Sequence, residues 1–285
     1  MGTPDNVSKE LFRDPAVFAD AFNFLLEKKG FHVDPAALRE MDPDQIVLSP
    51  GFNAKVAVER FRDVLKVMVS MTDGKTAYLI LGIENQTKIH LAMPIRVMLK
   101  DAMQYSSQIQ AAARAYEHER VNAKKEHREP VAKLASGSEF LSGLKEGDRL
   151  VPCITLVLYY GADPWTGPRT LHDMLDWENG REMLKAFVPD YPLNLIEPYG
   201  IAVEHFTKFK TELYLILKYI KYSNDKQGLS EMLKQDTAFH SATPRVIDTI
   251  NQITGSSIRY HQGEEAINAS NVIDEMIQDA VQEKE

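Results

Sequence analysis

The residues best suited to chemistry lie on two neighbouring strand-like runs in the first third of the chain. Asp63 belongs to an apolar run that precedes an Asp73-Gly74 turn, and Glu84 and Gln86 follow on the next run. Because side chains alternate across a strand, Glu84 and Gln86 point to the same face, which Asp63 can share from the adjacent run. Two carboxylates on one face of a sheet suit a divalent metal that activates water against a phosphodiester.

A structural role is an alternative interpretation of the same acids. Charges that flank buried strands also form ion pairs, and Arg62 and Lys66 are close partners for Asp63 in the sequence. Spacing alone therefore leaves both a metal site and an ion pair open. The sequence contains no Gly-rich phosphate loop, Ser-His-Asp order or dinucleotide fingerprint, which argues against nucleotide hydrolysis and dehydrogenation.

The elements that position these residues follow from hydrophobic periodicity and from helix and turn signals. Asp14 is a helix cap, Pro15 suits the first turn, and the apolar stripe that follows predicts a helix ending at Gly30. We also expect the following elements: a short helix over 35–41, strands over 56–58, 61–71 and 76–83, a long helix from Pro94 to about Glu117, a glycine-rich loop over 137–147, and a buried strand over 150–160.

The last third of the chain has a helical pattern. Helices are predicted near residues 171–175, 181–187, 206–220, 244–253 and 264–281. We therefore expect a mixed α/β core over residues 10–165, followed by a helical region over residues 166–285. That region would brace the core, mediate self-association or regulate the site.

Composition indicates a soluble protein in a reducing compartment. The 285-residue chain has 44% hydrophobic and 26% charged residues, and its single cysteine, Cys153, cannot pair within the chain. No apolar run approaches the roughly 18–20 residues of a membrane helix, and no secretory signal is visible. A cytoplasmic location without membrane contact is the expectation.

Charge gives a mixed indication about nucleic acid. The net charge of −8 argues against a general nucleic-acid binder, whereas residues 114–133 are rich in lysine and arginine. That basic segment is either a DNA-binding surface or a solvated helix face with pairs between residues one turn apart.

The order helix, strands, helix, strand, with an acid on the second strand and Glu-x-polar on the third, resembles the PD-(D/E)xK nuclease fold. The phrases VERFRDVLKVMV, YLILGIENQT, AMPIRVMLKDAMQY and LVPCITLVLYYGADPWTGPRTLHDML resemble the Rpn-type family of recombination-promoting nucleases and transposase-like proteins. DPAVFADAFNFLL resembles the first helix of that family. The resemblance spans residues 14–175, and its most specific part is Glu-Asn-Gln before Met-Pro-x-Arg.

The resemblance implies a Mg²⁺ site, with Mn²⁺ as an alternative metal. Asp63 and Glu84 would bind the metal, with the carbonyl of Asn85 as a further ligand. Gln86 stands where the wider fold often has a lysine, and an amide can orient a group but supplies no charge. Asp20 on the first helix is either an additional ligand or a solvated helical acid, and Glu27 is a second candidate there.

Three more residues are candidate DNA contacts: Arg96, Lys88 and Gln108. Arg96 would bind a phosphate or pair with a nearby acid. The resemblance thus implies a Mg²⁺-dependent DNA endonuclease linked to recombination or mobile elements, acting as a monomer or a homo-oligomer. The alternative is an inactive nuclease-fold module that binds DNA or a protein partner, which Gln86 and the acidic balance favour.

Overall fold

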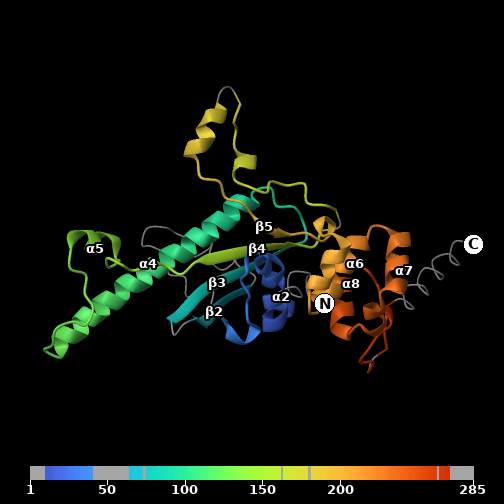
Figure 1. The fold of residues 1–285 in the computed structure, drawn as a ribbon, viewed down its shortest axis with the longest axis horizontal. Helices are drawn as coiled ribbons and strands as arrows, with labels where there is room; N and C mark the ends of the chain where they lie inside the picture. Colours follow the sequence, from blue (N-terminus) through green and yellow to red (C-terminus); the bar gives the residue numbers. More distant parts are fainter. Residues whose placement is uncertain are drawn as a thin grey trace, which may run out of the picture.

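The computed structural model describes residues 10–40, 64–72, 75–161, 163–178, 181–261 and 263–269. This part of the chain forms a mixed sheet with helices on both faces, so the predicted mixed α/β class is confirmed (Figure 1). The strands of the sheet are β1 (Leu38–Glu40), β2 (Val64–Thr72), β3 (Lys75–Gln86), β4 (Cys153–Tyr159) and β5 (Asn194–Ile196).

Helices of two kinds surround the sheet. The α-helices are α2 (Pro15–Leu26), α4 (Met93–Lys125), α5 (Gly137–Ser142), α6 (Leu213–Tyr222), α7 (Lys226–Gln235) and α8 (Pro244–Thr254). The 3-10 helices are η1 (Glu27–Lys29), η2 (Pro35–Ala37), η4 (His172–Met174), η5 (Arg181–Phe187), η6 (Pro198–Gly200), η7 (Val203–Lys208) and η8 (Thr237–Ser241). Within the described residues no helix combines the length and the apolar character needed to cross a bilayer.

The sheet changes direction at β3. Its strands lie in sequence order, β1, β2 and β3 pair antiparallel, and β3, β4 and β5 pair parallel. A parallel pair needs a crossover, and α4 supplies it between β3 and β4. The register places Val64 opposite Ile83 and Glu84 beside Val157. The carboxyl end of β3 therefore lies between β4 and the beginning of β2.

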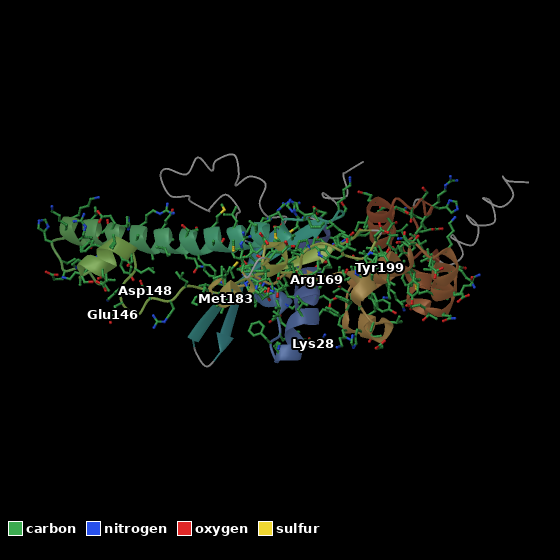
Figure 2. All side chains as sticks on the ribbon, turned by 90° about the horizontal axis from the view of Figure 1, so that it is seen from above. Lys28, Glu146, Asp148, Arg169, Met183 and Tyr199 are labelled. Atoms are coloured by element: carbon green, nitrogen blue, oxygen red, sulfur yellow. The ribbon has the colours of Figure 1, made fainter. Side chains whose placement is uncertain are left out.

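Each face of the sheet packs against a different helix. Alternation along β4 sends Leu156 and Leu158 into a core that they share with Phe18 and Phe22 of α2. Val157 and its same-face neighbours on β4 point the other way, toward α4. Helices α2 and α4 thus cover opposite faces of the sheet. Figure 2, turned by 90°, shows the long helix α4 running past the strands.

The core on the α2 side continues into the last third of the chain. Ile216 and Leu217 of α6, Leu233 of α7 and Ile250 of α8 belong to the same buried cluster as α2 and the sheet. The helices predicted to brace the core thus share a hydrophobic interior with it.

Helix α4 begins on the sheet and extends well beyond it (Figure 1). Its 33 residues correspond to about 50 Å at 1.5 Å per residue. Pro94 fits its first turn, where a missing N–H costs nothing. Beyond the sheet α5 packs against it at Gly143, where a Cβ would lie 2.9 Å from that of Ala113 and φ is +74°. A side chain at this contact would be both crowded and strained.

Several sequence predictions need correction. Residues 38–40 form strand β1, where a short helix was expected. The glycine-rich loop contains α5, which is capped by the reciprocal hydrogen bonds of Ser136 and Glu139. Strand β5 and helix α7 were missed. Residues 264–268, expected to begin a helix, include an isolated bridge from Ile267 to Ala242. The predicted strand over 56–58 and the Asp73-Gly74 turn lie outside the described residues.

Candidate functional site

Glu84 lies at the carboxyl end of β3, completely buried on the face that α4 covers. Lys100 of α4 forms an ion pair with its Oε1 atom, and both side chains are 1% exposed. A guanidinium nitrogen of Arg96 lies 3.5 Å from Oε2, and the Arg96 side chain is 30% exposed. Arg96 and Lys100 are four residues apart, so one face of the helix presents both cations to one carboxylate.

Glu84 and Lys100 carry their charges in the interior of the protein, away from water. Removing an ion from water costs several kcal/mol per group, and a paired partner with good geometry is needed to offset that cost. Glu84 meets two cations, and Arg96 extends from the buried pair to the surface. Of the two outcomes expected for Arg96, the structure shows the pairing with an acid.

The polar contacts continue along α4. We call the buried residues Glu84, Lys100, Asp101, Gln104 and Thr155 the polar seam; their exposed fractions are all 5% or less. The first two turns of α4 face the sheet with apolar side chains, whereas this stretch faces it with charges and amides. Most helices bury an apolar stripe against a sheet. The polar seam therefore indicates either a functional site or a hydrogen-bonded network that fixes one packing of the core.

Asp101 is tied into the seam by three donors. The Thr155 hydroxyl donates to its Oδ1 over 2.6 Å, and the Cys153 thiol approaches the same oxygen at 3.3 Å. The Tyr191 hydroxyl donates to Oδ2. Burial and the hydrogen bond to Asp101 together raise the pKa of Tyr191 above its ordinary value. Asp101 thereby fixes α4 against β4 one residue beyond Lys100.

The predicted strand residues fall at different depths. Asn85 is buried, and alternation places its side chain on the face opposite Glu84. Gln86 is half-buried, and its carbonyl accepts the N–H of Tyr160 over 2.7 Å. Lys88 is exposed in the segment before α4. Asp63, the other predicted metal ligand, lies outside the described residues.

Asp20 binds backbone groups far from Glu84 in the sequence. Its carboxylate accepts the N–H groups of Lys210, over 3.0 and 2.9 Å, and of Thr211, over 2.9 Å. The Thr211 hydroxyl donates to it as well, over 2.6 Å. These bonds hold α2 to the segment that leads into α6. We therefore leave Asp20 out of the metal site proposed below.

Gln108, a candidate DNA contact, is bound to the backbone of Val151. Its Oε1 accepts the Val151 N–H over 2.7 Å, and its Nε2 donates to the Val151 carbonyl over 3.0 Å. These two bonds join α4 to the backbone just before β4. The Gln108 amide therefore already has protein partners.

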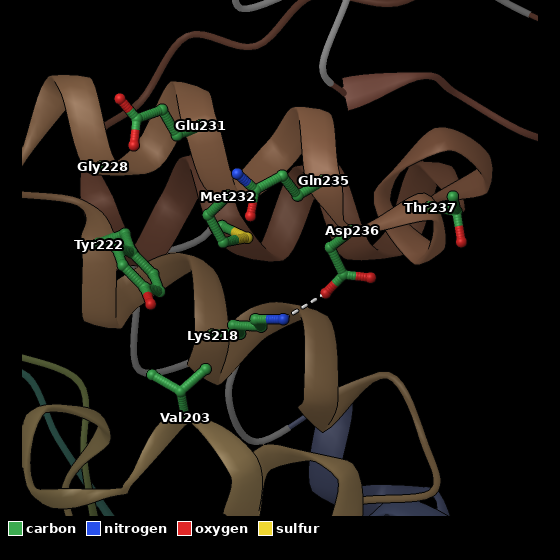
Figure 3. Close-up of a pocket in the computed structure, with 9 residues that line it drawn as sticks. All are labelled: Val203, Lys218, Tyr222, Gly228, Glu231, Met232, Gln235, Asp236 and Thr237. Carbon is green, nitrogen blue, oxygen red and sulfur yellow. Dashed lines mark hydrogen bonds and ion pairs between the residues drawn. The ribbon is translucent and has the colours of Figure 1, made fainter.

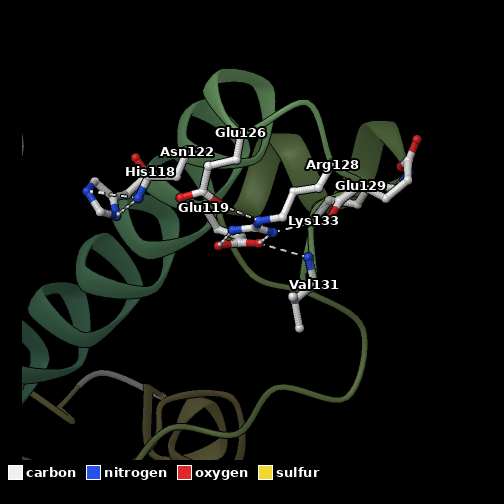
Figure 4. Close-up of polar contacts among 8 residues, drawn as sticks. All are labelled: His118, Glu119, Asn122, Glu126, Arg128, Glu129, Val131 and Lys133. Carbon is white, nitrogen blue, oxygen red and sulfur yellow. Dashed lines mark hydrogen bonds and ion pairs between the residues drawn. The ribbon is translucent and has the colours of Figure 1, made fainter.

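Residues of the basic segment, 114–133, form ion pairs with one another at and just beyond the end of α4 (Figure 4). Arg128 pairs with Glu119 over 2.7 Å and with Glu126 over 2.6 Å. The hydrogen bond from Arg128 lowers the pKa of Glu119 to about 2. Further pairs join Arg120 to Glu117 and Lys133 to Glu129. These contacts match the alternative of a solvated, internally paired surface.

A separate cavity of about 390 Å³ lies in the helical region (Figure 3). Lys218 at its edge pairs with Asp236 over 2.5 Å and contacts the Tyr214 hydroxyl over 2.9 Å. None of the residues that line this cavity belongs to the polar seam. The cavity therefore has no connection with the Glu84 chemistry.

Oxygen ligands for a metal are limited in the described part of the chain. No three His, Cys, Asp or Glu side chains gather there as a metal site. Glu84 offers hard carboxylate oxygens of the kind that Mg²⁺ binds. Asp63, the second predicted carboxylate ligand, lies outside the described residues. Comparison of the chain with protein families, with curated proteins and with solved structures finds no match.

Sequence reasoning missed Lys100 and Gln104. A signal for them was present, because Arg96, Lys100, Gln104 and Gln108 repeat every four residues within an otherwise amphipathic helix. Such a row shares one helix face. Only the packing of α4 shows that this face is turned toward the sheet and toward Glu84.

Proposed function

We propose that the protein is a metal-dependent nuclease that hydrolyses DNA phosphodiester bonds, with Asp63 and Glu84 as the ligands of a Mg²⁺ or Mn²⁺ ion. The observation that carries the proposal is the buried Lys100 ammonium on the Glu84 carboxylate. Beside a metal, an acid can hold the ion and a lysine can stabilise the charge that develops in phosphodiester hydrolysis. Lys100 supplies from α4 the positive charge that Gln86 lacks.

The fold supports the same proposal. Helix α2, the antiparallel β2–β3 pair, crossover helix α4 and parallel strand β4 follow the order of a PD-(D/E)xK core. Asp63 directly precedes Val64, and Val64 pairs with Ile83, the residue before Glu84. We therefore include Asp63 as the second carboxylate of the proposed site.

Each residue has a distinct task in the proposed reaction. The bound metal would polarise the scissile phosphate and lower the pKa of an attacking water. Lys100 stabilises the negative charge that develops on the phosphorus oxygens. Arg96, partly exposed beside Glu84, orients the phosphate, and Gln86 hydrogen-bonds the nucleophile. Water adds its oxygen to phosphorus, one P–O ester bond breaks, and a proton passes to the leaving oxygen.

Nicking of supercoiled plasmid in Mg²⁺ or Mn²⁺ tests the proposal. We expect cleavage that stops with chelator and is lost in Asp63→Ala, Glu84→Ala and Lys100→Met. Lys218→Met is the control, because it removes a lysine that is 12% exposed from another ion pair, outside the seam. Cleavage that survives in the Asp63 and Glu84 variants would refute the assignment.

A second candidate function, an inactive nuclease-fold module that binds DNA or protein, is favoured by one observation. Lys100 and Arg96 already neutralise Glu84, so its charge is balanced by the protein itself. In that case the plasmid stays intact while salt-sensitive DNA binding persists. Measuring binding at two salt concentrations alongside cleavage separates the two functions.

A further inference from the structure

The distal half of α4, the segment that follows it and α5 form an arm that projects from the sheet. We call residues 111–150 the arm, and Figure 1 shows it apart from the C-terminal helices. The structure describes all of these residues, and Ala123 alone among them is buried. Every ordered residue costs conformational entropy, which proteins offset mainly by burying apolar surface. The arm therefore lacks the buried surface that ordinarily stabilises an ordered segment.

The arm also exposes large apolar side chains. Phe140 and Leu141 are consecutive residues of α5, and they are 63% and 91% exposed. Val131, in the segment before α5, is 88% exposed. Single apolar residues on a surface are ordinary, whereas an adjacent aromatic and aliphatic pair on a projecting element is typical of a protein interface.

A groove on the same arm is suited to receive such side chains. It has a volume of about 340 Å³ and lies between α4 and the segment 144–150. Ala112 and Ala115 line it from α4, and Leu144 and Leu150 line it from that segment. Alanine side chains are small and leave space above the helix. The volume is at the lower end of the range for ligand pockets, which is room enough for an aromatic side chain.

Hydrogen bonds hold the walls of this groove together. The Tyr116 hydroxyl donates to the Asp148 carboxylate over 2.7 Å, and the N–H of Lys145 donates to the same oxygen over 2.8 Å. Gln108, which also lines the groove, is bound through its amide to the backbone of Val151. The groove is thus preformed, so a docking side chain need not rearrange its walls.

The charge of the arm indicates which partner covers it. The arm holds eight lysine and arginine residues against seven aspartate and glutamate residues, whereas the whole chain has a net charge of −8. Two copies of the chain would therefore repel one another over most of their surfaces and least at their arms. Arg120 and Arg128 are engaged with acids of the same arm, which reduces the positive charge available to DNA.

We propose that two copies of the chain associate through their arms, with Phe140 and Leu141 of each copy packed into the groove of the other. The apolar pair and the groove lie on one arm, so a two-fold axis lets both contacts form at once and closes the assembly at a dimer. The proposal does not depend on nuclease activity. Because the interface is confined to the arms, Glu84 of each copy stays outside it, and the dimer carries two candidate sites.

Sedimentation velocity of the full chain tests the proposal. We expect a dimer at concentrations on the order of 10 µM. Phe140→Asp/Leu141→Asp should raise the dissociation constant at least about 100-fold, because it would bring two carboxylates into an apolar groove. Both positions are exposed, so the circular dichroism spectrum should not change. Ala115→Arg, which fills the groove from α4, should weaken the dimer in the same way.

A matched control comes from η5, outside the arm. Met183 and Phe187 are 76% and 83% exposed, so Met183→Asp/Phe187→Asp also replaces two exposed apolar side chains by carboxylates. This variant should remain a dimer with a dissociation constant within about two-fold of the unmodified chain.

Cross-linking tests the groove contact itself. Leu141→Cys and Ala115→Cys are prepared separately in a Cys153→Ser background, because Cys153 is the single cysteine of the chain. A short bismaleimide linker should join the mixture of the two variants several times faster than either variant alone, since the proposed contact pairs residue 141 of one copy with residue 115 of the other.

Four results would overturn the inference. The first is an unmodified chain that stays monomeric up to about 100 µM. The second is a dimer that persists in Phe140→Asp/Leu141→Asp or in Ala115→Arg, and the third is equal loss of the dimer in the η5 control. The fourth is a mixture that cross-links no faster than its components. A monomer whose DNA binding falls in the Phe140 and Leu141 variant would assign the arm to nucleic acid instead.

Discussion

Lys100→Met should destabilise the protein strongly, even in the absence of metal. The substitution leaves the Glu84 carboxylate buried without its ammonium partner, and both side chains are 1% exposed. Removing one partner of a buried pair typically costs 3–5 kcal/mol. Arg96 remains 3.5 Å from the other oxygen and offsets part of that cost. We therefore expect a loss near the lower limit, about 3 kcal/mol of unfolding free energy.

Urea unfolding in chelator measures the loss of unfolding free energy. In thermal unfolding, the same loss of about 3 kcal/mol corresponds to a fall in melting temperature of roughly 6–12 °C for a chain of this size. Fluorescence and circular dichroism should give coincident transitions before a two-state free energy is used. The exposed pair of Lys133 and Glu129 is the matched control, and Lys133→Met should cost less than about 0.5 kcal/mol.

The double variant Glu84→Met/Lys100→Met distinguishes an unpaired charge from lost packing. Replacing both members of a buried pair by apolar groups is often neutral, so we expect at least half of the lost stability to return. Arg96 is partly exposed and can turn toward water. A loss below about 1 kcal/mol in Lys100→Met, or a double variant no more stable than the single one, would contradict the reasoning.

Three further variants test the assignments made for other residues. Asp20→Ala strips its acceptor from two backbone N–H groups before α6 and should cost about 2–3 kcal/mol in urea, with Mn²⁺ affinity unchanged; weaker Mn²⁺ binding would restore Asp20 as a ligand. Gln108→Leu breaks the pair with Val151 and should lower stability by about 1–2 kcal/mol, while a flatter salt dependence of DNA binding would instead indicate a DNA contact. The pKa of Glu119 falls from an ordinary 4.5 to about 2 beside Arg128, so its ion pair stabilises fully above about pH 4.5 and loses this effect toward pH 2. The stability difference between the unmodified chain and Glu119→Gln should shrink over that range in urea titrations, and a constant difference argues against the pairing.

The sequence was sufficient to predict the helices that begin with their own capping residues or a proline. The cap at Asp14 and the proline after it begin α2 as predicted, whereas α2 ends at Leu26 and Gly30 caps the short 3-10 helix η1 that follows. Pro94 likewise begins α4, although α4 continues to Lys125 through a charged stretch where the apolar pattern fades. Ion pairs between neighbouring turns support that stretch, so the hydrophobic period does not report where the helix ends.

Elements that depend on a distant partner were not predictable in the same way. Strands β1 and β5 have three residues each, and they exist because β2 and β4 offer free edges to pair with. Three residues are too few for a period-two pattern to be recognised. By contrast, α5 has a capping box at Ser136 and Glu139 that could have been read from the sequence.

In the candidate site, too, one residue could be predicted from the sequence and another only from the structure. Glu84 could be chosen from the sequence because it ends an apolar strand and because strand alternation gives it a defined face. Lys100 could not, since a lysine within a helix is ordinarily solvated and nothing in its local sequence names a partner sixteen residues earlier. The crossover between β3 and β4 turns α4 back over the strand it has just left, and only this packing buries Lys100 against Glu84. The acid was thus determined by local alternation, whereas its cations were decided by tertiary structure, because burial of charge depends on what the fold places opposite it.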